Sequence, residues 1–146
     1  SDIVALNSVP LPVDPRSLDA VVITHGHIDH IGYLPKLVRD GFIGPIYATV
    51  PTRALMNVVL EDAAHLQLHL KKRGFHEEPY APPPFYDEAN VQQTIAQTTA
   101  FELEKPFEAA GFSVVYKNAA HIIGSAFAGI EVEGRRVNLL RRHRPL

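Results

Sequence analysis

Ligand-type side chains are concentrated in one short stretch of this chain, where His25, His27, Asp29 and His30 lie within six residues. Neutral imidazole and carboxylate groups suit zinc and similar borderline cations. Side chains alternate along an extended segment, so His25 and His27 can point the same way and share one ion. Asp29 and His30 follow as the chain turns and could serve a second ion. The alternative is a polar loop of hydrogen-bonded histidines, but the clustering favours a metal site.

The apolar run Ala20-Val21-Val22-Ile23 comes directly before these residues and predicts a buried strand. The ligand-type residues therefore begin on the loop where that strand ends, which is where α/β proteins usually build their sites. The chain has no cysteine, so disulfides and thiolate metal ligands are excluded. Structural zinc sites more often use thiolates, whereas imidazole and carboxylate sites with an open position leave room for a reactive water.

The motif and its surroundings resemble a known family. The sequence from Thr24 to Pro35, Thr-His-Gly-His-Ile-Asp-His-Ile-Gly-Tyr-Leu-Pro, resembles the signature of the metallo-β-lactamase superfamily, and more closely that of its β-CASP branch of RNA-processing nucleases, such as the cleavage-and-polyadenylation endonucleases. Residues 41–49 and 120–126 are similar to the segment after that motif and to the next metal-ligand motif. The resemblance covers residues 14–137 and implies an α/β fold, the αββα sandwich, with zinc-dependent cleavage of RNA.

By this resemblance, His25, His27 and His121 hold one zinc ion, and Asp29 with His30 contributes to a second. Asp29 is also the candidate catalytic residue, because it would orient the attacking water. Zinc lowers the pKa of a bound water toward ~7, and the ions neutralise charge on the phosphoryl oxygens. The implied partner is RNA, and nothing in the sequence points to DNA.

The chain departs from the family after Val137. The family places Ser-Gly-Asp after the strand that begins there, with the aspartate bridging both metals, whereas this chain continues with Asn138, and no aspartate follows Asp87. His143 is either a substitute ligand or a solvent-exposed residue of the basic tail. The usual opening strands, the β-CASP cap and the C-terminal strands are also missing, so we expect a partial metallo-β-lactamase domain.

An incomplete sandwich would leave open strand edges and an uncovered apolar face, so a second copy or the missing segments would be needed to cover them. Without the bridging carboxylate the second ion should be weakly held, and we expect the isolated chain to be weakly active or inactive. Two other functions stay open. One is a hydrolase of a small ester, thioester or lactam on the same fold, and the other is a non-catalytic metal-binding or interaction remnant.

The other elements are predicted from periodicity and from the prolines and glycines, within one domain over residues 1–146. The loop 118–125 carries His121. The longest helix has an apolar stripe that we assign to core packing, formed by Leu55, Val59, Ala63, Leu66 and Leu70. The predicted segments are a lead-in connector 1–19, a helix from near Pro35 to Gly41, a strand 45–49, a helix 51–73, a proline-rich loop 77–87, a helix capped by Asp87 and ending near Gln97, strands 112–116 and 127–132, a turn at Gly134, a strand from Val137 and a divergent basic tail 138–146.

Composition limits the classes of function. The chain is 46% hydrophobic and 21% charged with a formal charge of −2, so affinity for RNA must come from a local patch and the metal site. No apolar run is long enough to cross a bilayer and no signal-peptide pattern occurs, so we expect a cytoplasmic protein without a membrane partner. A basic cluster near the end could contact phosphate or be a solvated terminal run, and its members are Arg135, Arg136, Arg141, Arg142 and Arg144.

A second set of ligand-type residues lies on the long predicted helix, where Glu61, His65 and His69 are spaced four apart on one face. Such triples are common on helix surfaces, and no neighbouring motif supports this one. We therefore predict a solvated face rather than a metal site. Asp62 is an acidic residue of the kind that the family carries on this helix, and we leave it outside the site as well.

Overall fold

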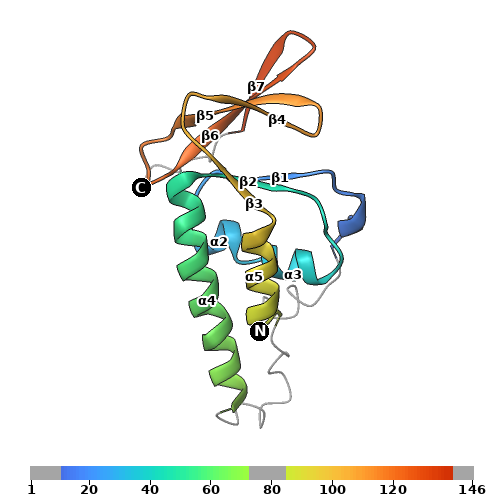
Figure 1. The fold of residues 1–146 in the computed structure, drawn as a ribbon, viewed down its shortest axis with the longest axis vertical. Coiled ribbons are helices and arrows are strands. Elements are labelled where there is room, and N and C mark those ends of the chain that lie inside the picture. The colour runs from blue at the N-terminus through green and yellow to red at the C-terminus, as the bar shows by residue number, and fades with distance from the viewer. Residues whose placement is uncertain (1–10, 73–84, 140–146) are drawn as a thin grey trace.

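The computed structural model describes residues 11–72 and 85–139, in which two β-sheets pack against each other (Figure 1). The antiparallel sheet lies at one end, and helices cover the other face of the parallel sheet. The elements are a 3-10 turn (Pro15–Ser17), β1 (Val21–Val22), α2 (Ile28–Ile31), α3 (Leu34–Arg39), β2 (Ile46–Thr49), α4 (Val50–Lys72), α5 (Glu88–Ala96), β3 (Thr98–Phe101), β4 (Pro106–Ala109), β5 (Phe112–Asn118), β6 (Ala126–Val132) and β7 (Arg135–Leu139). The predicted α/β class is confirmed.

Three predicted features lie outside the described residues. They are the first ten residues of the lead-in connector, most of the proline-rich loop, and the basic tail beyond residue 139 with His143. The described part of the connector contains the 3-10 turn, which Asp14 caps by accepting a hydrogen bond from the backbone of Arg16 at 3.0 Å.

The smaller sheet is parallel, with the strand order β1-β2-β3. Its side chains alternate between two apolar layers: Val21 and Ile46 pack toward the helices, whereas Val22 and Tyr47 pack toward the second sheet. A strand that is covered on both faces needs apolar residues at every position. This explains why the run before His25 is continuously apolar.

The buried face of α4 differs from the predicted stripe. Val59 and Ala63 are only partly buried and Leu66 is exposed. Val59 and Ala63 still pack against the core, so the prediction was wrong only in part. It counted only apolar side chains, whereas the helix is rotated so that the Thr52 hydroxyl reaches the carbonyl of Gly124. The fully or nearly fully buried positions of α4 are Thr52, Met56, Leu60 and Ala64.

In the described part of the chain, no helix combines the length and apolarity needed to cross a bilayer.

The two shorter predicted helices are confirmed at both ends. Asp87 caps α5 by accepting from the Asn90 backbone at 3.0 Å, and the Asn90 side chain accepts from the Asp87 backbone at 3.1 Å. This reciprocal pair satisfies two amide groups that the helix itself leaves without partners. After α3, Gly41 adopts a positive φ of 115°, which ends the helix at the predicted glycine.

The larger sheet is antiparallel, with the strand order β4-β5-β6-β7. The strands predicted around 112–116, 127–132 and 137 are confirmed, although β7 begins two residues early, at Arg135. The turns before β5 and β7 are both a pair of positive-φ residues ending in glycine, which matches the twist of a tight hairpin. Strands β3 and β4 were not predicted, because each is only four residues long and the polar residues in them obscure the alternation.

A tyrosine joins the two sheets. The hydroxyl of Tyr116 on β5 donates to the backbone carbonyl of Tyr47 on β2 at 2.8 Å. Burial raises the pKa of the Tyr116 hydroxyl, so the group keeps its proton and remains a donor. Beside it, the rings of Phe101 and Phe107 stack with centroids 4.0 Å apart. The sheets are therefore held in register by a directional bond as well as by apolar packing.

The strand β7 lies at the edge of this packing. Val137 and Leu139 pair with Ile130 and Ala128 of β6, so they point toward the inner face of the sheet, yet each remains about half exposed. Asn138 lies between them within β7 and is also exposed. An apolar inner face is thus uncovered at β7, and the expected second copy or further segment that would cover it stays a prediction.

A lysine, Lys36, is buried on α3. Lys36 pairs with Asp40 one helical turn later, and its ammonium lies 5.0 Å from the centre of the Tyr33 ring. Desolvation acts against the charge of both groups, but their mutual hydrogen bond and attraction outweigh it, raising the pKa of Lys36 and lowering the pKa of Asp40. Arg39 also contacts the Asp40 carboxylate.

The first prediction concerns this ion pair. Replacing Asp40 by asparagine leaves a buried ammonium without its counter-charge and should lower the free energy of unfolding by about 2 kcal/mol at pH 7. The folded-state pKa of Asp40 is depressed, so its contribution is complete above its usual pKa of about 4 and is lost as the pH falls through the folded value. Urea unfolding at pH 7 and near pH 3 should show the difference between Asp40→Asn and wild type shrinking at the lower pH.

The exposed carboxylate of Asp62 provides the control. Asp62→Asn should change stability by less than about 0.5 kcal/mol. Equal stability of Asp40→Asn and wild type at pH 7 would contradict the assignment.

Candidate metal centre

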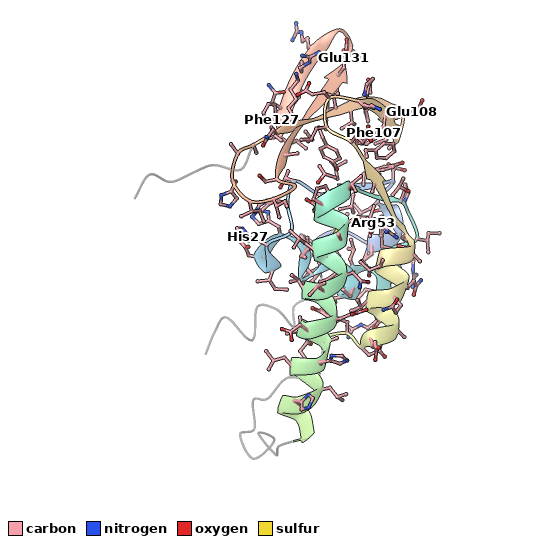
Figure 2. All side chains as sticks on the ribbon, turned by 60° about the vertical axis from the view of Figure 1, so that its left-hand side comes forward. His27, Arg53, Phe107, Glu108, Phe127 and Glu131 are labelled. Atoms are coloured by element: carbon pink, nitrogen blue, oxygen red, sulfur yellow. The ribbon has the colours of Figure 1, made fainter. Side chains whose placement is uncertain are left out.

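Three histidines from distant parts of the sequence meet at one end of the sheets. His25 and His27 lie between β1 and α2, and His121 lies in the loop that joins β5 to β6. One ring nitrogen of each histidine lies within 4.8 Å of the others. Within residues 11–72 and 85–139 these three form the one group of His, Asp or Glu side chains close enough to hold a metal ion. Figure 2 shows His27 at this end, below the antiparallel sheet.

The spacing of the nitrogens suits a small divalent ion. His121 Nε2 and His27 Nδ1 are 3.3 Å apart. Two nitrogens bound to one tetrahedral zinc ion at ordinary Zn–N lengths are separated by about 3.3 Å. The three rings stand nearly perpendicular to one another, with centroids 4.9 to 5.3 Å apart, so their nitrogens can converge without stacking the rings. The donor set and its geometry therefore fit a metal with three imidazole ligands and an open position.

The loop after β1 is fixed on both sides of His25. The backbone carbonyl of Thr24 accepts from the Ala126 amide at 2.7 Å, which ties the end of β1 to the start of β6. The Thr24 hydroxyl lies 3.0 Å from Nδ1 of His25, whose side chain is buried. When Nδ1 carries the proton and donates to that hydroxyl, Nε2 has a lone pair for a metal. Gly26 allows a close approach to α4, because a Cβ there would lie 3.1 Å from Cβ of Leu55, which is tighter than an ordinary contact.

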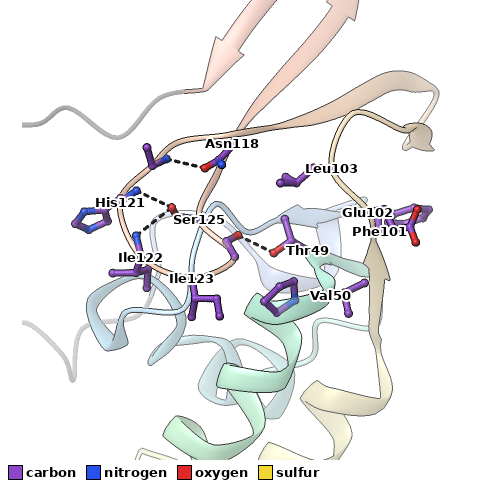
Figure 3. A pocket seen from close by; sticks show the side chains of 13 residues that line it. Thr49, Val50, Phe101, Glu102, Leu103, Asn118, His121, Ile122, Ile123 and Ser125 are labelled. Carbon is purple, nitrogen blue, oxygen red and sulfur yellow. Dashed lines mark hydrogen bonds between the residues drawn. The ribbon is translucent and has the colours of Figure 1, made fainter.

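The loop that carries His121 is held by the hydroxyl of Ser125. This hydroxyl accepts from the backbone amides of His121 and Ile122 at 3.0 and 3.1 Å (Figure 3). The Ser125 amide in turn donates to the Ile122 carbonyl at 2.9 Å. Three backbone donors and one backbone acceptor are thus satisfied inside a five-residue loop. The backbone of His121 is fixed before any ligand binds.

The same loop is attached to the start of α4 through one carbonyl. The hydroxyls of Thr49 and Thr52 donate to the Gly124 carbonyl at 2.7 and 2.9 Å. Gly124 has a φ of 77°, and a Cβ at this position would lie 2.7 Å from the Thr52 amide nitrogen and 2.8 Å from Cβ of Pro51. Only glycine fits both the backbone conformation and the available space.

The residues that position His121 were missed by sequence reasoning. Thr49, Thr52 and Ser125 are buried polar residues whose hydroxyls hold loops, and none of them is a ligand-type side chain. Two threonines three residues apart, where a predicted strand meets a predicted helix, are a pattern typical of a helix N-terminus and could have indicated a buried hydroxyl pair.

Asp29 and His30 lie beside the three histidines but do not join them in one group. The rings of His30 and His25 are 4.0 Å apart, and the Asp29 carboxylate lies 3.5 Å from Nε2 of His30. Both residues belong to the short helix α2, and Asp29 is mostly exposed. The structure therefore places a carboxylate and an imidazole next to the three-histidine group, on one side of it.

The alternative set on α4 does not form a group. Glu61 accepts from the Gln92 side chain at 2.8 Å, His65 lies 4.0 Å from Glu88, and His69 interacts with the His65 carbonyl. Each of these side chains has a separate partner on α5 or on its own helix. This agrees with the prediction of a solvated helix face.

The second prediction tests how the His121 loop is attached. Gly124→Ala should lower the free energy of unfolding by about 2–3 kcal/mol, because the new methyl group meets the α4 backbone in addition to the strain of a positive φ. It should also weaken zinc binding about tenfold by displacing His121. Urea unfolding and a zinc titration with a competing chelator would measure the two effects.

Gly134→Ala is the matched control. Gly134 has a similar φ of 74°, but nothing lies within 4 Å of the added Cβ. This variant should show only the backbone strain, about 1 kcal/mol, and unchanged zinc affinity. Equal effects of the two substitutions on both quantities would contradict the role of the Gly124 contact.

Comparison with known proteins identifies several relatives. Ribonuclease TTHA0252 of Thermus thermophilus is 36% identical over 131 residues, which are 90% of this chain and 27% of that protein. The transcription termination factor FttA of Methanothermobacter thermautotrophicus is 35% identical over 125 residues, covering 85% of this chain and 18% of the factor. The chain thus spans about a quarter or less of the length of these curated relatives.

A solved structure shares the fold. MEM-A1, a subclass B3 metallo-beta-lactamase isolated from a soil metagenome library, superposes with a TM-score of 0.50 at 15% identity, covering 88% of this chain and 42% of that one. The sequence pattern of the Metallo-beta-lactamase superfamily matches residues 9–113, which include β1, His25, His27 and the helices that support them. Sequence pattern and fold agree, and the chain belongs to the metallo-beta-lactamase superfamily.

Proposed function

We propose that this chain carries the metal site of a zinc-dependent hydrolase of the β-CASP type, which cleaves RNA phosphodiester bonds. The observation that supports this most strongly is the meeting of His25, His27 and His121 at one point, from motifs about a hundred residues apart. The names of the relatives support the choice of substrate, since one is a ribonuclease and the other a transcription termination factor. The likeness to MEM-A1 supports the fold alone, so no observation favours a lactam substrate.

Each residue has a distinct task in this proposal. The three histidines hold the first ion, and the Thr24 and Ser125 contacts keep two of them aimed at it. When bound, zinc supplies a Lewis acid and a water that ionises near neutral pH. Asp29 is the exposed carboxylate beside this group, and it would orient the attacking water and accept its proton. His30 would share a second ion with Asp29.

The second ion is the weaker part of the site. Efficient phosphodiester hydrolysis uses two ions about 3.5–4 Å apart, which stabilise both the attacking and the leaving oxygen. This chain has no aspartate beyond Asp87, so Asp29 and His30 are left to hold the second ion without a bridging carboxylate from β7. We therefore propose that the chain by itself cleaves RNA slowly.

The third prediction concerns metal content. Purified wild-type chain should retain zinc after dialysis, and His25→Ala combined with His27→Ala should lose it, because a single remaining imidazole cannot compete with water for the ion. Elemental analysis by mass spectrometry measures zinc per chain.

A matched double variant controls for the loss of two histidines. His65→Ala with His69→Ala removes two imidazoles from the exposed face of α4 and should leave the zinc content unchanged. Equal zinc in wild type and the His25/His27 variant would refute the assignment, and loss of zinc from the α4 variant would restore the site that we reject.

The fourth prediction concerns catalysis. Asp29→Asn keeps the size of the side chain but removes its basicity, and it should lower the rate of zinc-dependent cleavage of a labelled single-stranded RNA by about 100-fold or more. Zinc in the three-histidine site should be retained, because Asp29 is not one of its ligands. Single-turnover cleavage and elemental analysis on the same sample separate the two effects.

The control is Asp62→Asn, which alters an exposed carboxylate on α4 and should cleave at the wild-type rate. A cleavage rate of Asp29→Asn equal to that of wild type would remove Asp29 from the catalytic role. Fast cleavage by wild type that depends on Asp29 would show instead that no bridging carboxylate is needed.

A further inference from the structure

A hollow of about 650 Å³ lies beside the metal centre, between the start of α4, the segment joining β3 to β4, and the His121 loop (Figure 3). We call it the aliphatic hollow, because Val50, Leu103 and Ile123 line it while remaining 52%, 37% and 71% exposed. A volume of this size is typical of small-molecule sites, which are concave and mostly apolar. Three large aliphatic side chains that converge on one concavity while exposed to water indicate a surface that a ligand covers.

The aliphatic hollow and the metal centre share a residue. His121 belongs to the three-histidine group and also lines the hollow. The loop that carries His121 is held against the start of α4, because Thr49 and Thr52 donate to the Gly124 carbonyl. A molecule that fills the hollow would therefore have one end beside the metal, so the hollow is placed to bind the part of a substrate next to its reacting bond.

The charges around the hollow select the kind of group that fits. No lysine or arginine is among its lining residues, and Glu102 contributes a carboxylate that pairs with Lys105 at 2.7 Å. Phosphate is therefore disfavoured. Asn118 also lines the hollow, and because its Oδ1 accepts from the Ala120 amide at 2.8 Å, its amide nitrogen provides two N–H donors. Apolar walls with an amide donor and a carboxylate acceptor suit a flat ring that is apolar on its faces and polar at its edge.

We propose that the aliphatic hollow binds a nucleobase of the RNA substrate, next to the phosphate that reacts at the metal centre. This inference rests on the proposed function for its choice of substrate. Proteins that bind RNA without sequence preference hold the bases mainly through contacts with their flat faces. A hydrogen bond to the edge of a base adds a preference for that base. A hydrophobic side chain of another protein would also fill an apolar hollow, but it would use neither the Asn118 donor nor the connection to His121.

The experiment is an NMR titration that uses isoleucine methyl groups as reporters and needs no catalysis. The chain is labelled with ¹³C at isoleucine methyl groups and titrated with adenosine, in EDTA and again with zinc, and ribose serves as the ligand without a base. The signals of Ile122 and Ile123 should shift and saturate with adenosine, because a bound base shields methyl groups at its face. Ile43, which is 83% exposed in the segment between α3 and β2, should not move.

Two variants then distinguish binding of adenosine in the hollow from non-specific binding elsewhere on the surface. Ile123→Gln alters a surface side chain, and it should weaken adenosine binding at least fivefold as followed at Ile122. Ile43→Gln, which alters another highly exposed isoleucine elsewhere, should leave the affinity unchanged. Equal shifts from ribose and adenosine, equal shifts at Ile43 and Ile123, or no shift at either would overturn the proposal. Ile123 signals that broaden with protein concentration alone would assign the hollow to a protein contact and also overturn it.

The adenosine titration in EDTA does not depend on the metal, because it measures binding of adenosine to the hollow directly. Failure of the proposed function would appear instead as a wild-type chain that holds no zinc. A chain that binds zinc but not adenosine would refute this inference and leave the proposed function standing.

Discussion

The structure depends most on the attachment of the His121 loop to the start of α4. Two hydroxyls, of Thr49 and Thr52, converge on the single carbonyl of Gly124, and glycine is the residue that allows the approach. This contact joins the antiparallel sheet to the layer of the parallel sheet and the helices. It also sets the rotation of α4, since Thr52 must be buried for the bond to form. The third histidine reaches the other two because this contact holds its loop in place.

The site is rigid at its backbone and exposed at its reactive side. Thr24 and Ser125 fix the segments that carry His25 and His121, so the entropy of arranging the ligands is spent when the chain folds rather than when a metal binds. Asp29 lies on the solvent side, on a helix of only four residues. Such an arrangement would suit the proposed activity, in which a long, flexible RNA enters from solvent while the ligands stay in place.

Much of the fold was predictable from the sequence, and so were the three histidines that the structure brings together. The apolar run before His25, the proline and glycine bounds of α3, and the Asp87 cap of α5 each have a local physical cause and were confirmed. The buried face of α4 and the strands β3 and β4 were not predictable, because long-range contacts decide them. The burial of Thr52 depends on a carbonyl 72 residues away. The resemblance to a family, not local pattern, joined His121 to the first motif.

Zinc K-edge X-ray absorption on the chain loaded with one equivalent of zinc would show directly whether the three histidines share one ion. Three imidazoles on one ion predict a shell of nitrogen and oxygen near 2.0 Å, with the outer-shell scattering of about three histidine rings. We expect this result for the wild type, and the scattering of one histidine ring fewer for His121→Ala. A six-coordinate ion with at most one imidazole, or a spectrum that His121→Ala leaves unchanged, would contradict it.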